Sequence, residues 1–198
     1  MSTIDEVSQL EPFCYTRYVN KNTPIVFSDG TEFYAQLAKK YIKHSSGFFI
    51  LAPSASGKTY FINNQKDNDW IDGDYLWPAT NADLSSDEWN INLEDVYENN
   101  RRSDVITYQA KKLGFWVIGS SNESLKPDAI VILPWETQVE YIKKKESMTY
   151  DGGATMADVE SIRKHRQIVS LWEDKGVPCF ESIGEAVDFL TKSSKLVH

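Results

Sequence analysis

Residues 47–62, GFFILAPSASGKTYFI, decide the fold that the sequence predicts. The apolar run FFILA at 48–52 leads into a segment of small residues, and aromatic and aliphatic residues resume after Thr59. This pattern predicts a short buried strand, a tight turn and the start of a helix. A strand, a small-residue turn and a helix in this order are the context of a phosphate-binding loop.

The segment APSASGKT at 52–59 matches the phosphate-loop pattern of Gly, four residues, Gly, Lys and then Ser or Thr, except that Ala52 replaces the first Gly. Small residues let successive backbone N–H groups close around an oxyanion. We expect Lys58 to reach the terminal phosphates of a nucleotide and the Thr59 hydroxyl to bind Mg²⁺. The residues expected to bind the nucleotide are Ser54, Ala55, Ser56, Gly57, Lys58 and Thr59. A turn that contains Gly-Lys-Thr without binding phosphate is the alternative.

Apolar strands alternate with helical segments along the rest of the chain. Strands are predicted at 69–72, 115–121, 129–134 and 177–182, and helices at 31–44, 93–114, 135–146, 159–176 and 183–195, the second of them continuous or broken near Asn99. This alternation predicts an α/β fold, a three-layer α/β/α arrangement with a mostly parallel five-stranded sheet. We expect an N-terminal extension at 1–30 and one domain at 31–198.

Composition limits the classes of function. The chain has 198 residues and a net charge of −8, which opposes purely electrostatic binding to a nucleic-acid backbone but leaves a local basic cleft open. No apolar run reaches 18 residues, so we expect no membrane span. Cys14 and Cys179 lie far apart without metal-ligand spacing, and residues 1–13 lack the pattern of a signal peptide. We therefore expect a cytoplasmic protein.

Two carboxylates follow the second predicted strand, in WIDGDYLWP at 70–78. The other strands end in Ser120 or Pro134, so none of them supplies the strand-end Asp that helicases and many ATPases use to bind magnesium. Asp74 is placed to orient an acceptor hydroxyl and take its proton, and Asp72 either shares that role or holds Mg²⁺ through water. An Asp-Gly turn with solvated carboxylates is the alternative.

With these two motifs, the chain resembles the P-loop kinases of small acceptors, which include nucleotide, gluconate, adenylylsulfate and polynucleotide kinases. The resemblance covers residues 48–190 and implies a P-loop kinase fold with a helical lid and an ATP-dependent transfer of the γ-phosphate to an acceptor, with Mg²⁺. The matching lid is at about 146–168, where Gly152 and Gly153 are the expected hinge. Arg163 and Arg166, three residues apart on one helix face, are the expected lid cations, and an exposed helix with solvated charges is the alternative.

The acceptor is less closely defined. Family members that phosphorylate a phosphate group usually have an Arg soon after the Gly-Asp, and this chain has Leu76 and Trp77 there, which favours a hydroxyl acceptor. Trp77 is the expected base-stacking residue, and Ser120 lies at a strand end where ligands bind in α/β sheets. Arg101 and Arg102 either grip an acceptor phosphate or form a plain surface pair.

The sequence favours a nucleotide-type acceptor, such as DNA, RNA or a modified nucleoside or base. A small-metabolite kinase, a nucleoside monophosphate kinase and a non-catalytic nucleotide-binding switch stay open as alternatives. His165 is interpreted as a surface residue, and no second His stands at ligand spacing, so it is given no metal role.

Overall fold

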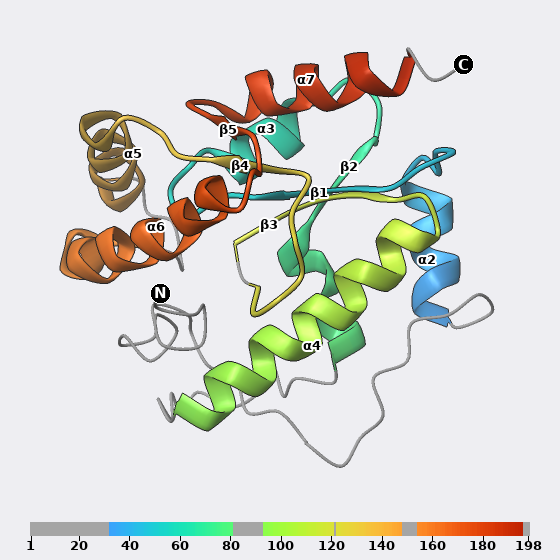
Figure 1. The fold of residues 1–198 in the computed structure, drawn as a ribbon, viewed down its shortest axis with the longest axis horizontal. Helices are drawn as coiled ribbons and strands as arrows, with labels where there is room; N and C mark the ends of the chain where they lie inside the picture. The colour runs from blue at the N-terminus through green and yellow to red at the C-terminus, as the bar shows by residue number, and fades with distance from the viewer. Residues whose placement is uncertain (1–31, 81–92, 121, 148–153, 196–198) are drawn as a thin grey trace.

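The structure, a computed structural model, describes residues 32–80, 93–120, 122–147 and 154–195 (Figure 1). The predicted extension at 1–30 and the predicted hinge, Gly152 and Gly153, lie outside these residues. The strands are β1 (Phe48–Leu51), β2 (Trp70–Asp72), β3 (Trp116–Gly119), β4 (Ala129–Val131) and β5 (Cys179–Phe180). The α-helices are α2 (Glu32–Lys40), α3 (Lys58–Asn64), α4 (Leu93–Lys112), α5 (Trp135–Ser147), α6 (Val159–Asp174) and α7 (Ile183–Lys195). Two 3₁₀ helices, η1 (Gly73–Thr80) and η2 (Met156–Asp158), complete the described elements.

The five strands form one sheet in the order β2-β3-β1-β4-β5, and each pairing among them is parallel. The predicted five-stranded sheet is therefore confirmed, and it is entirely parallel within the described residues. β1 lies in the middle, where Ile50 pairs with Ile118 of β3 on one side and with Ala129 of β4 on the other. The phosphate-loop candidate thus leaves the sheet from its central strand.

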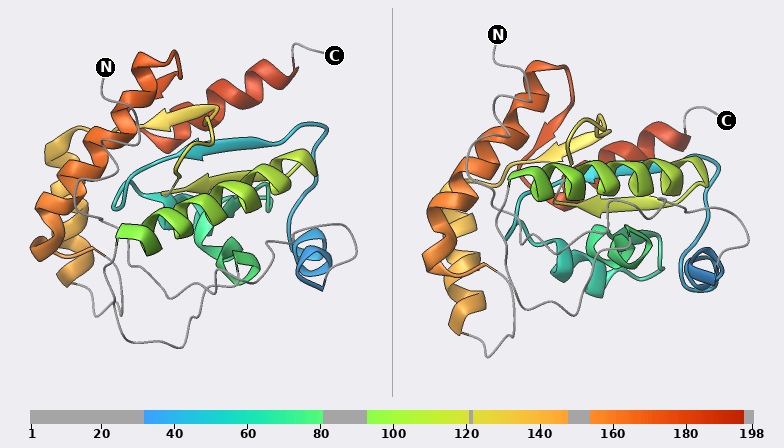
Figure 2. Two further views of the ribbon diagram at one scale, coloured as in Figure 1. Left: turned by 60° about the horizontal axis from the view of Figure 1, so that its bottom comes forward. Right: turned by 90° about the horizontal axis from the view of Figure 1, so that it is seen from below.

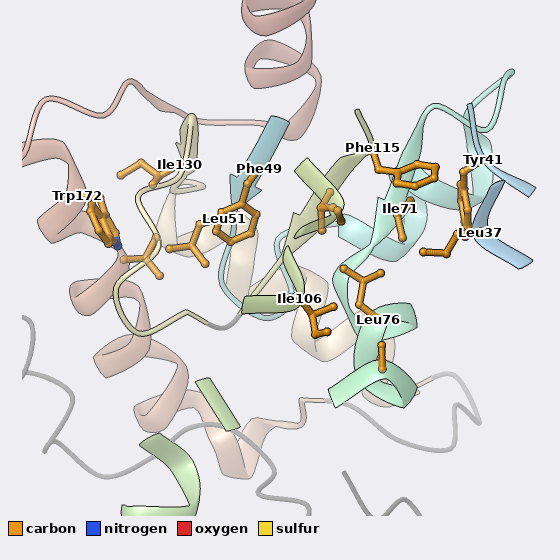
Figure 3. Packing of buried hydrophobic residues seen from close by; sticks show 14 of the residues in the cluster. Leu37, Tyr41, Phe49, Leu51, Ile71, Leu76, Ile106, Phe115, Ile130 and Trp172 are labelled. Carbon is orange, nitrogen blue, oxygen red and sulfur yellow. The ribbon is translucent and has the colours of Figure 1, made fainter. Parts of the chain in front are cut away.

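Side chains alternate between the two faces of the sheet, as strand geometry requires. Phe49 and Leu51 of β1 pack into one core with α2, α4 and α6, which Figure 3 shows around Ile106 and Trp172. Ile50 and Ala52 point to the opposite face, into a second core with α3 and α7. Burying each such large apolar side chain contributes roughly 1.5–3 kcal/mol. Helices thus cover both faces, which confirms the predicted three-layer arrangement (Figure 2).

The connections from neighbouring strands diverge at the carboxyl end of β1. The chain leaves β1 through α3 on one face, whereas it leaves β4 through α5 and α6, and α6 packs on the other face. β1 and β4 are neighbours, so the two connections diverge between them. In open α/β sheets, ligands bind at such a switch point, outside the carboxyl ends of the strands.

Two local expectations needed the structure to decide them. α4 runs without a break through Asn99, whose side chain is buried, so the continuous form of this helix is the correct one. The composition between Trp77 and Trp89 predicts a loop after β2, but the segment begins as the 3₁₀ helix η1, and residues 81–92 lie outside the described ranges.

Candidate functional site

The substitution of Ala52 for the first Gly of the pattern fits the fold. Ala52 is fully buried, and its N–H donates to the carbonyl of Gly119 at 2.9 Å, which continues the pairing of β1 with β3. Among the described non-glycine residues only Ala55 has a positive φ, so the backbone at position 52 is of an ordinary type. A Cβ is therefore tolerated where the pattern has glycine.

The turn after Ala52 uses left-handed backbone at two positions. Ala55 has φ 58° and Gly57 has φ 88°. Alternating left- and right-handed residues bring successive N–H groups to one side of the chain and form an anion-binding concavity. Glycine adopts this conformation without strain, whereas a non-glycine residue there costs of order 1–3 kcal/mol and persists only when its surroundings hold it in place. The strain at Ala55 therefore requires a structural cause.

Side chains of the loop cover its carbonyl groups. The buried Lys58 directs its Nζ to the carbonyls of Ala52, at 3.2 Å, and Pro53, at 3.0 Å. The Ser56 hydroxyl also donates to Pro53, at 2.6 Å. The partial negative charges of these carbonyls, which would repel an anion, are thereby neutralised. The ammonium group is held at the loop, where it can turn to an incoming phosphate.

Helices α5 and α6 lie side by side at the carboxyl end of the sheet and support the loop from outside (Figures 1 and 2). Gln138 of α5 donates through Nε2 to the Ser54 carbonyl at 2.7 Å. Ala55 packs beside a small apolar cluster that Ile142 and Ile162 share with Ala154. Tyr141, exposed on α5, lies next to Gly57, so that a Cβ built on this glycine would meet its ring at 3.8 Å.

The two predicted acidic residues form one turn where β2 passes into η1. The N–H of Asp74 donates to Oδ1 of Asp72 at 3.1 Å. Asp72 is partly buried, whereas Asp74 is exposed. Burial raises the pKa of Asp72, and the charge of Asp74 raises it further, against the opposing influence of Lys58 and Lys145. Asp72 pairs with Ile118 of β3, and Ile118 pairs with Ile50 of β1, so the predicted acidic turn and the predicted phosphate loop leave the same edge of the sheet.

The close approach of Gly73 to β3 requires a glycine between these two carboxylates. A Cβ at this position would lie 2.9 Å from Cα of Gly119 and 3.3 Å from the carbonyl oxygen of Ile118. The turn therefore packs its bare backbone on β3. This contact fixes Asp72 and Asp74 against the strand that adjoins β1.

The structure adds two basic side chains to the site that sequence analysis did not assign to it. Lys145, in the last turn of α5, acts on Asp72 electrostatically. His165 of α6 is partly buried, not on the surface as predicted, with a hydrogen bond to the backbone of Ser120. Burial and then the charge of Lys58 lower the pKa of His165 to about 4, so the ring is neutral at pH 7.

The two predicted lid cations, Arg163 and Arg166, both lie on α6. Arg166 donates through Nη1 to the carbonyl of Leu133 and to Oε1 of Gln138, the latter at 2.9 Å, so it belongs to the support of the loop. Arg163 is exposed, lies 3.5 Å from Glu160 and has its guanidinium 4.9 Å from the ring centre of Trp135. Contact of either residue with a bound phosphate stays a prediction.

The predicted acceptor-binding residues outside the acidic turn come from α4, from the end of β3 and from η1. Arg101 and Arg102 both bind Glu98 of α4, Arg101 on the surface and Arg102 fully buried. Ser120 follows β3 at the same edge as the phosphate loop, as predicted. The side chain of Trp77 lies outside what the structure describes, so base stacking by this residue stays a prediction.

The neighbourhood of Ser120 is held by a buried carboxylate. Oδ2 of Asp104 in α4 accepts the backbone N–H groups of Glu123 at 3.1 Å, Ser124 at 2.6 Å and Leu125 at 2.9 Å. Burial raises the pKa of Asp104, and these hydrogen bonds oppose that rise. α4 thereby fixes the described segment that follows β3 at the edge of the site.

The arrangement fits the binding of a magnesium-bound polyphosphate. Mg²⁺ prefers oxygen ligands and is usually bound by one or two carboxylates together with substrate phosphates. Thr59, at the start of α3, and Asp72 are oxygen-bearing residues of this site and would hold it. Within the described ranges no group of three or more His, Cys, Asp and Glu side chains is placed to hold a metal by itself.

Comparisons of the chain with protein-family models, curated proteins and solved structures find no match. None of the helices within the described ranges is both long and apolar enough to cross a membrane.

Proposed function

We propose that the protein is an ATP-dependent kinase of the P-loop type that transfers the γ-phosphate to a hydroxyl group. The observation that carries the proposal is that the candidate phosphate loop and the acidic turn leave the same edge of the sheet, after the parallel strands β1 and β2. A phosphate loop alone is common to many nucleotide-binding proteins. A carboxylate on the acceptor side supports phosphoryl transfer to a hydroxyl, because it can take the proton of that hydroxyl.

In this mechanism the loop binds the β- and γ-phosphates through backbone N–H groups and Lys58. Bound Mg²⁺ would neutralise charge on the phosphates, with Thr59 and Asp72 as its protein ligands. Asp74, exposed and beside Asp72, accepts the proton of the acceptor hydroxyl as that oxygen bonds to the γ-phosphorus. The bond between the γ-phosphorus and the bridging oxygen breaks, and ADP leaves with that oxygen.

Helix α5 adds groups that suit the same substrate. Lys145 lies within electrostatic reach of Asp72 and supplies positive charge in addition to that of Lys58. The exposed ring of Tyr141 beside Gly57 offers a surface on which a base could stack. The proposed lid at about 146–168 includes the start of α6, and its residues 148–153 lie outside the described ranges.

We propose a nucleotide-type acceptor, namely DNA, RNA or a modified nucleoside or base, with a small metabolite or a nucleoside monophosphate as the alternative. Arg101, exposed on α4, supports the first class, because a surface guanidinium suits the phosphate of such an acceptor. Transfer of label from γ-labelled ATP to a panel of gluconate, nucleosides, nucleoside monophosphates and single- and double-stranded DNA and RNA distinguishes these acceptors.

Replacement of Asp74 by Asn tests the chemistry. We expect Asp74→Asn to abolish most of the transfer while ATP affinity is retained, because the amide keeps the size of the side chain but cannot take the proton. Asp67→Asn, which removes an exposed carboxylate ahead of β2, is the matched control and should transfer like the wild type. Normal transfer by Asp74→Asn, or no labelled acceptor in the panel, would contradict the proposal.

A nucleotide-binding switch without chemistry is the second candidate. The hydrogen bond between Gln138 and Ser54 favours it, because this bond links the loop to α5 and through it to α6. In a switch, Asp74→Asn should alter neither ATP binding nor the movement of these helices, and no acceptor should be labelled.

A further inference from the structure

A buried amide connects the phosphate loop to the two late helices. Gln138 is 1% exposed, and both ends of its amide are engaged. Nε2 donates to the carbonyl of Ser54 at 2.7 Å, and Oε1 accepts from Nη1 of Arg166 at 2.9 Å. The same Nη1 donates to the carbonyl of Leu133, just beyond β4. The chain of contacts therefore runs from the loop, through α5, to α6 and the end of the sheet.

The order of these contacts fixes which way the amide points. A guanidinium has donors and no acceptor, so the atom of Gln138 that faces Arg166 must be its oxygen. The amide nitrogen is then the atom that faces Ser54, where a carbonyl requires a donor. Arg166 thereby determines the orientation of Gln138, and Gln138 determines the orientation of the Ser54 carbonyl.

Holding this carbonyl also orients the next N–H group. The peptide unit is planar and trans, so the carbonyl of Ser54 and the N–H of Ala55 point in opposite directions. With the carbonyl drawn toward α5, the N–H of Ala55 points away from α5. Ala55 is also the residue with the strained φ of 58°, which needs surrounding contacts to persist.

We propose that Gln138 and Arg166 are positioning residues of the phosphate loop, which hold the Ser54–Ala55 peptide so that the Ala55 N–H faces the bound phosphates. This inference rests on the proposed binding of a nucleoside triphosphate. It gives Arg166 a task behind the loop, where the sequence had suggested a lid cation. It also makes the position of α5 and α6 a determinant of nucleotide affinity.

The experiment measures the affinity of the full chain for Mg·ATP by calorimetry at pH 8. Gln138→Leu should weaken binding about tenfold to a hundredfold, the range for leaving a buried carbonyl without its donor. Gln138→Glu gives the sharper result. An ionised Glu, the form that the adjacent Arg166 favours, can accept from Arg166 but cannot donate to Ser54.

We therefore expect Gln138→Glu to bind Mg·ATP as weakly as Gln138→Leu, although it keeps the contact with Arg166. Thr137→Glu is the matched control, because it adds the same charge one residue away without replacing the amide. A general effect of charge would give Thr137→Glu the same loss of affinity.

Arg166→Leu should also weaken binding, and in the Gln138→Leu background it should add little, because the two residues act as one unit. Binding by Gln138→Leu within twofold of the wild type, wild-type binding by Gln138→Glu, or an equal loss of affinity in Thr137→Glu would each overturn the inference. Failure of the wild type to bind Mg·ATP would instead overturn the proposed function.

Discussion

Replacement of Gly73 by Ala tests whether the acidic turn depends on close packing against β3. The added Cβ would stand 2.9 Å from Cα of Gly119 and 3.3 Å from the carbonyl oxygen of Ile118. Both are backbone atoms of a central strand, so neither can rotate out of the way. The turn itself must move, and overpacking of this kind costs about 1–3 kcal/mol.

The stability change can be measured by urea unfolding, followed by the fluorescence of the six tryptophans. For a chain of this size, a loss of about 1–3 kcal/mol lowers the melting temperature by roughly 2–12 °C. Gly184→Ala is the matched control, because a Cβ there would meet nothing within 4 Å. Since Gly184 lies in α7, its replacement should stabilise the protein by up to about 0.5–1 kcal/mol.

The functional result is more specific than the loss of stability. Displacing the turn moves Asp72 and Asp74 and leaves the loop around Lys58 in place, so phosphate transfer should fall more than ATP affinity. A Gly73→Ala protein with wild-type stability and wild-type transfer would refute the packing argument. A Gly73→Ala protein that loses ATP affinity and transfer equally would refute the assignment of the acidic turn to the acceptor side.

Three further predictions concern the same site. Burial and the charge of Asp74 raise the pKa of Asp72 in the folded protein, so the protein loses stability as the pH rises above the unfolded pKa near 4. Asp72→Asn should therefore raise the free energy of urea unfolding at pH 7 and leave it nearly unchanged at pH 3. The pKa of His165 is lowered to about 4 in the folded chain, so between pH 6.5 and pH 4 the unfolded chain binds a proton that the folded chain does not. The free energy of unfolding therefore decreases as the pH is lowered through this window. His165→Gln should remove about 1–2 kcal/mol of the loss between pH 7 and pH 5, and an equal loss in both proteins would contradict this role. Ala55→Gly should keep ATP affinity in calorimetry and change stability by less than about 1 kcal/mol, because the relief of left-handed strain offsets the greater freedom of glycine in the unfolded chain, whereas Ala55→Val should destabilise the loop.

The sheet was predictable because its strands carry strong local signals. FFIL, WVIG and AIV are buried apolar runs bounded by turn residues, and each became a strand close to its predicted place. Strand order was not predictable, because it depends on which apolar faces meet in space. The loop from Ala52 to Thr59 was also predictable, since its composition is what left-handed turns and close phosphate contact need.

The support of the loop was missed, although a signal for it exists in the sequence. Gln138, Ile142 and Lys145 follow the three- and four-residue spacing of the buried stripe of α5. His165 and Arg166 stand in the same way between Ile162 and Val169 on α6. A polar residue within an apolar stripe indicates a buried hydrogen bond, because an unpaired buried polar group is costly. What the sequence does not contain is the partner, since Ser54 and Gln138 are brought together only by the tertiary fold.

The central claim is that residues 52–59 bind the phosphates of a nucleoside triphosphate, and calorimetric titration of the wild type and Lys58→Met with Mg·ATP tests it most directly. Methionine keeps the length of the side chain and removes the ammonium group that contacts the carbonyls of Ala52 and Pro53. The account predicts that the wild type binds Mg·ATP and that Lys58→Met, still folded, binds it about tenfold to a hundredfold more weakly. Equal binding by the two proteins, or no binding by the wild type, would contradict it.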